Sequence, residues 1–110
     1  QILLGRAKAR CEALTLMTWK LPTEIDTLSP ADASATKVYG SELNVEAYRA
    51  LKEIVGPASG ITGDSPGAAL AGRLERFFRS SLVMTFGGGT NEIQRDIIGY
   101  VGLGLPAAKR

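Results

Sequence analysis

The chain has 110 residues, of which 45% are hydrophobic and 22% are charged, with a net charge of +2. This length suits one small domain with a single hydrophobic core. The lack of His excludes a His-based catalytic triad, and the single cysteine, Cys11, excludes an intrachain disulfide. Any metal site would need oxygen ligands only.

The basic residues are scattered along the chain, which argues against nucleic acid or a membrane surface as a partner. No apolar run reaches the roughly 18 residues of a membrane span. Cysteine usage favours a reducing, cytoplasmic location. The opening "QILLGRAKAR" resembles a helix already under way, without a cap or an acidic first turn. We therefore expect residues 1–110 to be a fragment of a longer protein.

Two helices are predicted in the first half. Residues 2–20 carry a helical stripe, and two prolines in "LPTEIDTLSP" interrupt it. Ser29 as N-cap and Pro30 at the first position predict a second helix that runs to about Val55. Gly40 weakens that helix by about 1 kcal/mol unless another helix packs closely there. The stripe of the first helix consists of Leu3, Leu4, Ala7, Cys11, Leu14 and Met17.

Two further helices are predicted after the connector "GPASGITGDSPG". Ser65 and Pro66 predict the start of the third helix, and Gly89 precedes the fourth. No strand signal is present, so the sequence predicts an all-α, up-and-down bundle of about four helices. The apolar positions of the third helix are Leu70, Leu74, Phe77, Phe78 and Leu82, and those of the fourth are Ile93, Ile97 and Val101. We also expect Met17, Trp19, Met84 and the two phenylalanines in the core.

The stretch "TFGGGTNEIQRDII" places three glycines directly before the fourth helix. Thr90 is the expected N-cap. Glu92 brings a carboxylate into the first turn, where it complements the helix dipole and would repel a phosphate. This helix start suits a neutral polar ligand edge, such as a flavin, better than a diphosphate. A plain glycine-rich helix–helix turn explains the same stretch.

The segment "FGGGTNEIQRDIIGYVGLGLP" resembles the C-terminal signature of the acyl-CoA dehydrogenase family. The resemblance extends upstream through "LERFFRSSLVMTF" and, by helix pattern, over nearly the whole chain. It implies an N-terminal helical domain, a middle β-domain and a C-terminal helical bundle, of which this chain would form most of the last. The first helix of that bundle would lie before Gln1.

The family oxidises acyl-CoA thioesters to trans-2-enoyl-CoA with FAD. A carboxylate takes the α-proton, and the β-hydride goes to the flavin. The resemblance therefore implies an acyl-CoA substrate, electron-transfer flavoprotein as acceptor, and a homo- or hetero-tetramer built partly by this bundle. Relatives with a similar C-terminal sequence are actinobacterial and act on sterol side chains. The resemblance therefore also implies a bacterial origin and a role in fatty acid or sterol side-chain β-oxidation.

The same resemblance assigns cofactor contacts. Gly89, Thr90 and Glu92 correspond to positions that touch the flavin, and Glu53 and Gly56 to positions near the adenine end. Relatives often have Gln where this chain has Glu92 or Glu53, so both positions depart from the family pattern.

The usual catalytic base is missing. Many relatives have Glu two residues before the threonine, where this chain has Gly88, and glycine cannot abstract a proton. In some members the glutamate comes from the first helix of the bundle, and in mixed tetramers a partner subunit can supply it. Glu92 or Asp96 could substitute, but helix-end electrostatics explains both. We expect no catalytic residue in this chain.

Other functions share this fold. The chain could be a non-catalytic helical assembly module or subunit of a mixed tetramer. Acyl-CoA oxidases and flavin monooxygenase relatives have the same bundle, and oxygen reactivity of the reduced flavin would distinguish them.

Overall fold

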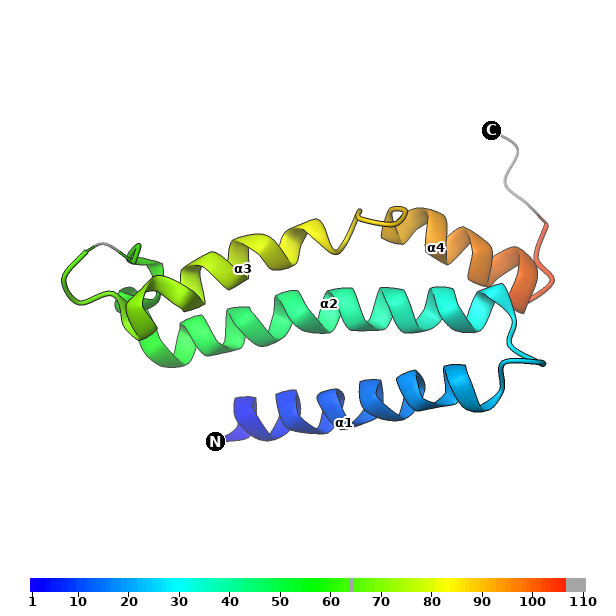
Figure 1. Ribbon diagram of the computed structural model, residues 1–110, viewed down its shortest axis with the longest axis horizontal. Coiled ribbons are helices and arrows are strands. Elements are labelled where there is room, and N and C mark those ends of the chain that lie inside the picture. The colour runs from blue at the N-terminus through cyan, green and yellow to red at the C-terminus, as the bar shows by residue number, and fades with distance from the viewer. Residues whose placement is uncertain (64, 107–110) are drawn as a thin grey trace.

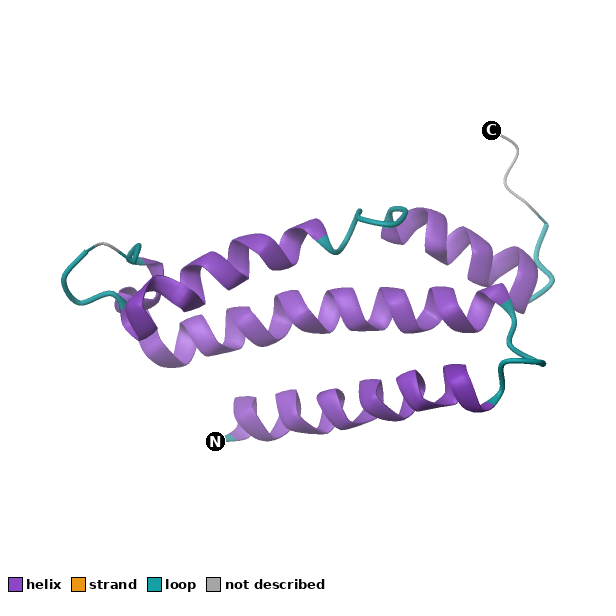
Figure 2. Cartoon of the chain, in the orientation of Figure 1, coloured by secondary structure: helices purple, strands orange, loops and turns teal. Residues whose placement is uncertain are grey.

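The structure is a computed structural model that describes residues 1–63 and 65–106. Helices α1 (Ile2–Thr23), α2 (Pro30–Val55), α3 (Arg73–Val83) and α4 (Asn91–Ile97) are joined by turns, and the described residues contain no strand. Helix α2 lies in the centre, with α1 along one side and α3 followed by α4 along the other (Figures 1 and 2). The predicted all-α bundle is confirmed.

The start of α2 follows the sequence signal. Ser29 Oγ accepts a hydrogen bond from the Asp32 backbone N–H at 3.3 Å, and the Asp32 carboxylate accepts one from the Ser29 backbone N–H at 3.2 Å. This capping box satisfies two backbone donors that the helix itself leaves free. The predicted cap, the proline at the first position and the end at Val55 are all confirmed.

Helix α1 extends further than predicted because Pro22 is accommodated in its last turn. The apolar stripe is only half-buried, and Leu4 and Cys11 are exposed. Close packing between α1 and α2 occurs at Gly40, where an added Cβ would lie 3.2 Å from Leu14 Cδ1. Glycine at position 40 permits this close approach of α1 to α2, which is the condition under which its cost to the helix was expected to be offset.

The prediction that Ser65 and Pro66 start the third helix is wrong. The chain forms the 3₁₀ turns Gly56–Gly60 and Ala69–Gly72, and α3 begins only at Arg73. Leu70 and Ala71 adopt positive φ, and at Gly72 (φ 69°) an added Cβ would lie 2.2 Å from the Gly63 backbone nitrogen. This backbone contact forces a left-handed reversal that no helix can contain. Leu70 is consequently 71% exposed instead of lying on an apolar helix face.

The core is smaller and more polar than predicted. Its apolar members all come from α2 and α3, and five polar residues are buried beside them. Trp19, Met84 and Phe77 are exposed and Met17 is half-buried, so their assignment to the core is wrong for this chain. The buried apolar residues are Ala31, Val38, Leu43, Val45 and Leu74, and the buried polar ones are Ser34, Ser41, Ser59, Ser81 and Asn91.

The fourth helix is short. Helix α4 passes at Ile98 into a π-helical turn, Ile98–Gly102, so Val101 belongs to that turn and is exposed. Gly102 packs against the start of α2, where an added Cβ would lie 2.9 Å from the Ala31 Cβ. This contact holds the end of the α4 segment against α2.

Candidate functional site

The three-glycine turn between α3 and α4 forms a closed, exposed loop. The Gly87 N–H donates to the Val83 carbonyl at 2.8 Å, and the Asn91 N–H donates back to the Thr85 carbonyl at 2.9 Å. Gly88 and Gly89 adopt φ angles of 70° and 102°, a region that favours glycine. Closing the loop in this way requires glycine at both positions.

Thr90 caps α4 as predicted, because its Oγ1 accepts from the Ile93 N–H at 3.3 Å. The Glu92 backbone N–H holds the pKa of the Glu92 carboxyl below its ordinary value, with a further contribution from the Thr90 hydroxyl. A carboxylate with a lowered pKa is a weaker base. Asp96 is exposed one turn later. The catalytic role weighed for either residue gains no support from this geometry.

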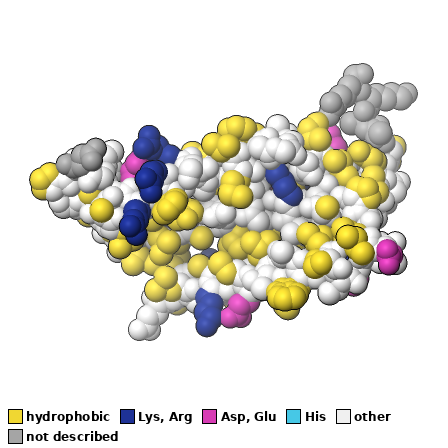
Figure 3. Space-filling view, viewed as in Figure 1, with side chains coloured by type: hydrophobic (Ala, Val, Ile, Leu, Met, Phe, Trp, Pro, Cys, Tyr) yellow, Lys and Arg dark blue, Asp and Glu magenta, His cyan; other side chains and the backbone are white. Residues whose placement is uncertain are grey.

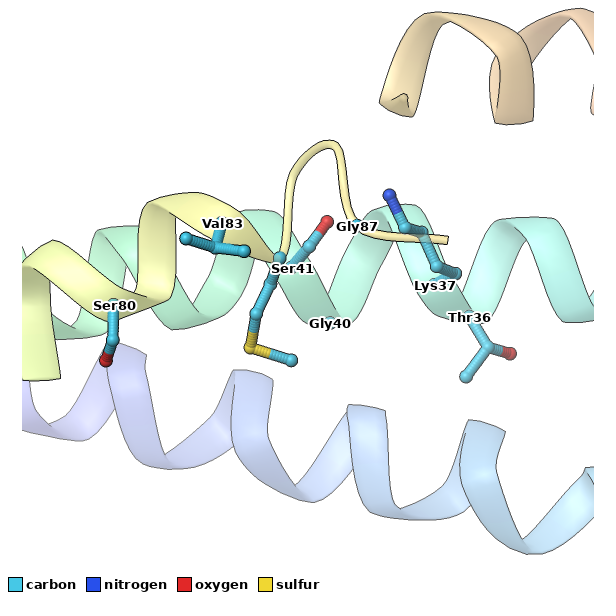
Figure 4. Close-up of a pocket in the computed structure, with 8 residues that line it drawn as sticks. Thr36, Lys37, Gly40, Ser41, Ser80, Val83 and Gly87 are labelled. Atoms are coloured by element: carbon cyan, nitrogen blue, oxygen red, sulfur yellow. The ribbon is translucent and has the colours of Figure 1, made fainter. Parts of the chain in front are cut away.

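Lys37 of α2 reaches the turn from below. Its Nζ donates to the Gly89 carbonyl at 2.7 Å, to the Asn91 Oδ1 at 2.7 Å and to the Thr85 carbonyl at 3.3 Å. Figure 4 shows the Lys37 side chain extending from α2 to the side on which the loop with Gly87 lies. These contacts connect residues about fifty positions apart in the sequence.

Asn91 is the buried centre of the polar contacts around the turn, at 5% exposure. Its Nδ2 donates to Ser41 Oγ at 3.0 Å and to Glu42 Oε1 at 3.4 Å. The same Glu42 oxygen accepts from Arg95 at 2.5 Å. We call Lys37, Ser41, Glu42, Asn91 and Arg95 the polar cluster. It fixes the first turn of α4 on α2, since buried polar groups stay in place only with their partners satisfied.

Sequence reasoning missed the polar cluster. A signal was present, because Lys37 and Ser41 are polar residues four positions apart, a spacing that places both on one face of α2. Which partners they meet depends on the packing of α4 against α2, and no local pattern in the sequence specifies it.

The two groups of predicted cofactor contacts lie far apart. Gly89, Thr90 and Glu92 are exposed around the turn, above Lys37. Glu53 is exposed near the end of α2, and Gly56 follows as its C-cap with φ 74°. At 1.5 Å per residue, positions 37 and 53 are separated by roughly 24 Å along the helix. The structure therefore does not bring the two groups into one site.

A groove of about 460 Å³ lies beside the turn, between α2 and the end of α3. It is lined by Thr36, Lys37, Gly40, Ser41, Ser80, Val83, Met84 and Gly87 (Figure 4). Most of these side chains are small or apolar. The groove can therefore accept an apolar group, while the Lys37 stem forms part of its wall.

Residues 1–103 match the sequence model of the acyl-CoA dehydrogenase C-terminal domain. The chain belongs to the acyl-CoA dehydrogenase family. Acyl-CoA dehydrogenase FadE26 of Mycobacterium tuberculosis (strain ATCC 25618 / H37Rv) is 53% identical, with 100% of this chain and 29% of the relative covered. Acyl-CoA dehydrogenase FadE29 of the same strain is 36% identical, with coverages of 97% and 27%.

Solved structures of acyl-CoA dehydrogenase relatives have the same fold. A chain of the ChsE4-ChsE5 complex from Mycobacterium tuberculosis is 56% identical with a TM-score of 0.91, covering 98% of this chain and 28% of the other. A chain of the Tcur3481-Tcur3483 steroid ACAD is 44% identical with a TM-score of 0.90, covering 96% and 28%. Both descriptions name two components. The present chain thus spans less than a third of the proteins it matches.

The described part of the chain offers neither a membrane-spanning helix nor a metal-binding cluster. Within residues 1–63 and 65–106, no helix has both the length and the apolar character to cross a bilayer. The same residues contain no group of three His, Cys, Asp or Glu side chains placed to hold a metal ion. The cytoplasmic location stays a prediction.

The three-glycine turn between α3 and α4 can present its backbone to a flat, neutral ring. Apart from Gly88 itself and its two chain neighbours, nothing lies within 4 Å of the position of a Cβ on Gly88, so this side of the turn is open. Glu92 and Thr90 are engaged with the helix start, and the carboxylate opposes a phosphate at this position. The residues present therefore fit the ring portion of FAD better than its diphosphate.

Proposed function

We propose that this chain is the FAD-contacting and oligomerising C-terminal domain of an acyl-CoA dehydrogenase that forms trans-2-enoyl-CoA from an acyl-CoA. We further propose that the acyl group carries a steroid. The observation that carries the proposal is the 56% identity over 98% of the chain with a component of the ChsE4-ChsE5 complex. The 44% identity to a steroid ACAD supports the substrate class.

In this proposal residues 1–110 form one domain, and other parts of the parent protein bind the thioester and most of the cofactor. FAD supplies the acceptor for the hydride that leaves the β-carbon. Gly89, Thr90 and Glu92 contact its flavin portion, and the open backbone at Gly88 supports this assignment. Glu53 and Gly56 contact an adenine end. The roughly 24 Å along α2 between Lys37, which lies under the turn, and Glu53 implies contacts with separate parts of the cofactor or with two FAD molecules.

The proton at the α-carbon is taken by a carboxylate outside these 110 residues. Gly88 occupies the usual base position, and Glu92 has a lowered pKa because its own backbone N–H stabilises the charged form. The base then comes from an earlier helix of the parent protein or from a partner subunit. Electron-transfer flavoprotein is the proposed acceptor of the electrons.

Association with other subunits accounts for the exposed apolar surface. Figure 3 shows hydrophobic side chains across the face in view, with basic side chains over the first half of α3. Patches larger than a few hundred Å² favour association. The largest exposed apolar side chains include Leu16, Trp19, Phe86, Tyr100 and Leu103, which are 46–72% exposed.

Two observations favour a second function. The glycine at the base position suits a non-catalytic subunit of a mixed tetramer, in which the partner subunit performs the proton transfer. The ChsE4-ChsE5 complex and the Tcur3481-Tcur3483 steroid ACAD each have two named components, which supports such an arrangement.

The test is to express the parent protein alone and together with its candidate partner, and to record flavin absorbance and product formation. We expect stoichiometric FAD in the assembly and enoyl-CoA formation with a steroid-CoA thioester above that with a straight-chain acyl-CoA. An assembly without FAD would overturn the proposal. FAD bound by the partner subunit whether or not this chain is present would favour the non-catalytic subunit. Rapid reaction of the reduced flavin with oxygen would favour an acyl-CoA oxidase or monooxygenase.

A further inference from the structure

Lys37 has a bonding arrangement that the family resemblance does not explain. A lysine ammonium carries three N–H donors. All three are used, on Gly89 O and Asn91 Oδ1 at 2.7 Å and on Thr85 O at 3.3 Å. The three acceptors are neutral oxygens, so the positive charge is held by backbone and amide groups.

The acceptors lie on both sides of the glycines. Thr85 precedes Gly87, whereas Gly89 and Asn91 follow Gly88. One ammonium group therefore joins the two ends of the loop, next to the backbone bond from Asn91 N to Thr85 O at 2.9 Å. Both ends are thereby tied to α2, which is the longest helix of the described residues.

Side-chain contacts cannot place the glycines, and among the three only the Gly87 N–H donates a short backbone bond, to the Val83 carbonyl at 2.8 Å. They carry no side chains, and the Gly88 carbonyl accepts only a long bond of 3.4 Å from Gln94 Nε2. Glycine populates positive and negative φ about equally well, so an untethered three-glycine stretch samples several conformations. The contacts from Lys37 select one of them, together with the two backbone bonds that close the loop.

We propose that Lys37 is a positioning residue, whose ammonium clamps both ends of the three-glycine turn and so sets where Gly88, Gly89 and Thr90 meet the flavin. This inference rests on the proposed function, because it concerns the contact between the turn and FAD. In this proposal the Lys37 ammonium acts through the turn, because all three of its donors are used there. It determines how well the turn is ordered before the cofactor arrives, and preorganised contacts bind more tightly.

A purely structural role predicts something different. Loss of the ammonium would then lower stability without changing the flavin environment or the order of the turn in the folded protein. The distinction needs a readout at the turn and a readout on the cofactor. Backbone amide exchange of Gly87 and Asn91, which donate the two bonds that close the loop, gives the first. The visible absorbance and circular dichroism of bound FAD give the second.

The experiment uses the assembled parent protein with Lys37→Met, which keeps the stem and removes the donors, and with Lys37→Arg, which keeps the charge. The matched control is Lys8→Met, since Lys8 is an exposed α1 lysine paired with Glu12 at 3.8 Å. Without added FAD, we expect amide exchange of Gly87 and Asn91, whose N–H groups close the loop, to accelerate at least tenfold in Lys37→Met and to stay unchanged in Lys8→Met.

With FAD, we expect the dissociation constant to rise about tenfold in Lys37→Met, with altered visible dichroism and partial recovery in Lys37→Arg. Lys37→Gln, which retains two donors, provides the same test if Lys37→Met does not fold. A folded variant with wild-type exchange, FAD affinity and dichroism would overturn the inference alone. A wild-type assembly that binds no FAD would overturn the proposed function, and the proposal for Lys37 with it.

Discussion

The two halves of α2 meet the segment from α3 to α4 through different kinds of contact. In the first half, Lys37 and Ser41 form directional hydrogen bonds to the turn and to Asn91. In the second half, Tyr48 stacks on Phe77 with ring centroids 6.2 Å apart, and Lys52 lies 4.5 Å from the centre of the Phe78 ring. Leu51, Ile54 and Val55 remain exposed there.

This difference indicates which parts of the molecule are held in a single, well-defined position. A satisfied network of buried hydrogen bonds allows one arrangement, because any displacement leaves a polar group unpaired. Ring contacts and apolar packing tolerate small shifts. The turn that we assign to the flavin lies over the first half, whereas Glu53 and Gly56 lie at the looser end. Contacts at that end would become fixed only on binding.

The largest expected effect is at the connection beyond the second half of α2. Gly72→Ala places a Cβ 2.2 Å from the Gly63 nitrogen at a positive φ. Overpacking costs about 1–3 kcal/mol, and the left-handed conformation about 1–2 kcal/mol more. We expect a loss of about 2–5 kcal/mol in the free energy of unfolding, measured by urea denaturation.

The control is Gly67→Ala, which has φ 82° but open space around the added Cβ. It should lose only the conformational contribution of about 1–2 kcal/mol. Equal losses in the two variants would mean that the backbone contact between residues 63 and 72 does not constrain the connection.

The next largest effect is expected when the Asn91 side chain is removed, because this disrupts the polar cluster at the first half of α2. Asn91→Ala takes one acceptor from Lys37 and leaves Ser41 with one partner fewer. Unsatisfied buried partners cost about 1–3 kcal/mol. Asn44→Ala is the matched control, since Asn44 is only part-buried and donates to Met84 Sδ at 3.4 Å. Similar unfolding free energies for the two variants would contradict a special role of the polar cluster.

Substitutions at the two helix caps distinguish an effect on stability from an effect on FAD binding. Ser29→Ala and Thr90→Ala each remove a side-chain acceptor from a helix start. Each should cost about 1 kcal/mol, measured by thermal unfolding. Only Thr90→Ala should weaken FAD binding in the assembled protein. A change in FAD affinity of the same size for Ser29→Ala would argue against a flavin contact at Thr90.

The smallest effects concern pH. A hydrogen bond from Lys20 holds the pKa of Asp32 below its ordinary value, and the same bond raises the pKa of Lys20. The Asp32 contribution to stability is present above about pH 3.9 and is lost as the pH falls through the lowered pKa. The Lys20 contribution is present below about pH 10.4 and is lost as the pH rises through the raised pKa.

Glu92 behaves as Asp32 does, because its own backbone N–H stabilises the ionised form. Thermal unfolding of Asp32→Asn and Glu92→Gln at pH 7 and pH 3 checks this. Each variant should show a slightly smaller acid-induced decrease in melting temperature than the wild type. A decrease identical to that of the wild type would contradict the inferred direction of the pKa shift.

Local chemistry explains which predictions held. Ser29, Pro30 and Thr90 act on the two or three residues that follow them, so their caps could be found from the sequence. The Ser65 and Pro66 signal failed, although it had the same form. The contact between Gly63 and Gly72 requires left-handed residues up to position 72, and tertiary contact overrode the local preference.

The candidate site divides in the same way. The three glycines and Thr90 were visible as a turn and a cap because their conformational preferences are intrinsic to the residues. Lys37 and Asn91 were not assigned to the site, since their partners lie about fifty positions away and each type is common on a solvated helix face. Trp19 and Met84 were misplaced in the core because apolar periodicity identifies a face to be covered, and this chain leaves those side chains exposed.

The sequence by itself determined the helical class, the span of α2, the cap of α4 and the family, since these depend on periodicity, local hydrogen bonding and a contiguous signature. Only the tertiary structure decided where α3 begins, which residues are buried and what holds the glycine turn. Those features depend on the distance between segments remote in the chain. Helix packing sets that distance, and it brings the Lys37 ammonium to the two ends of the turn.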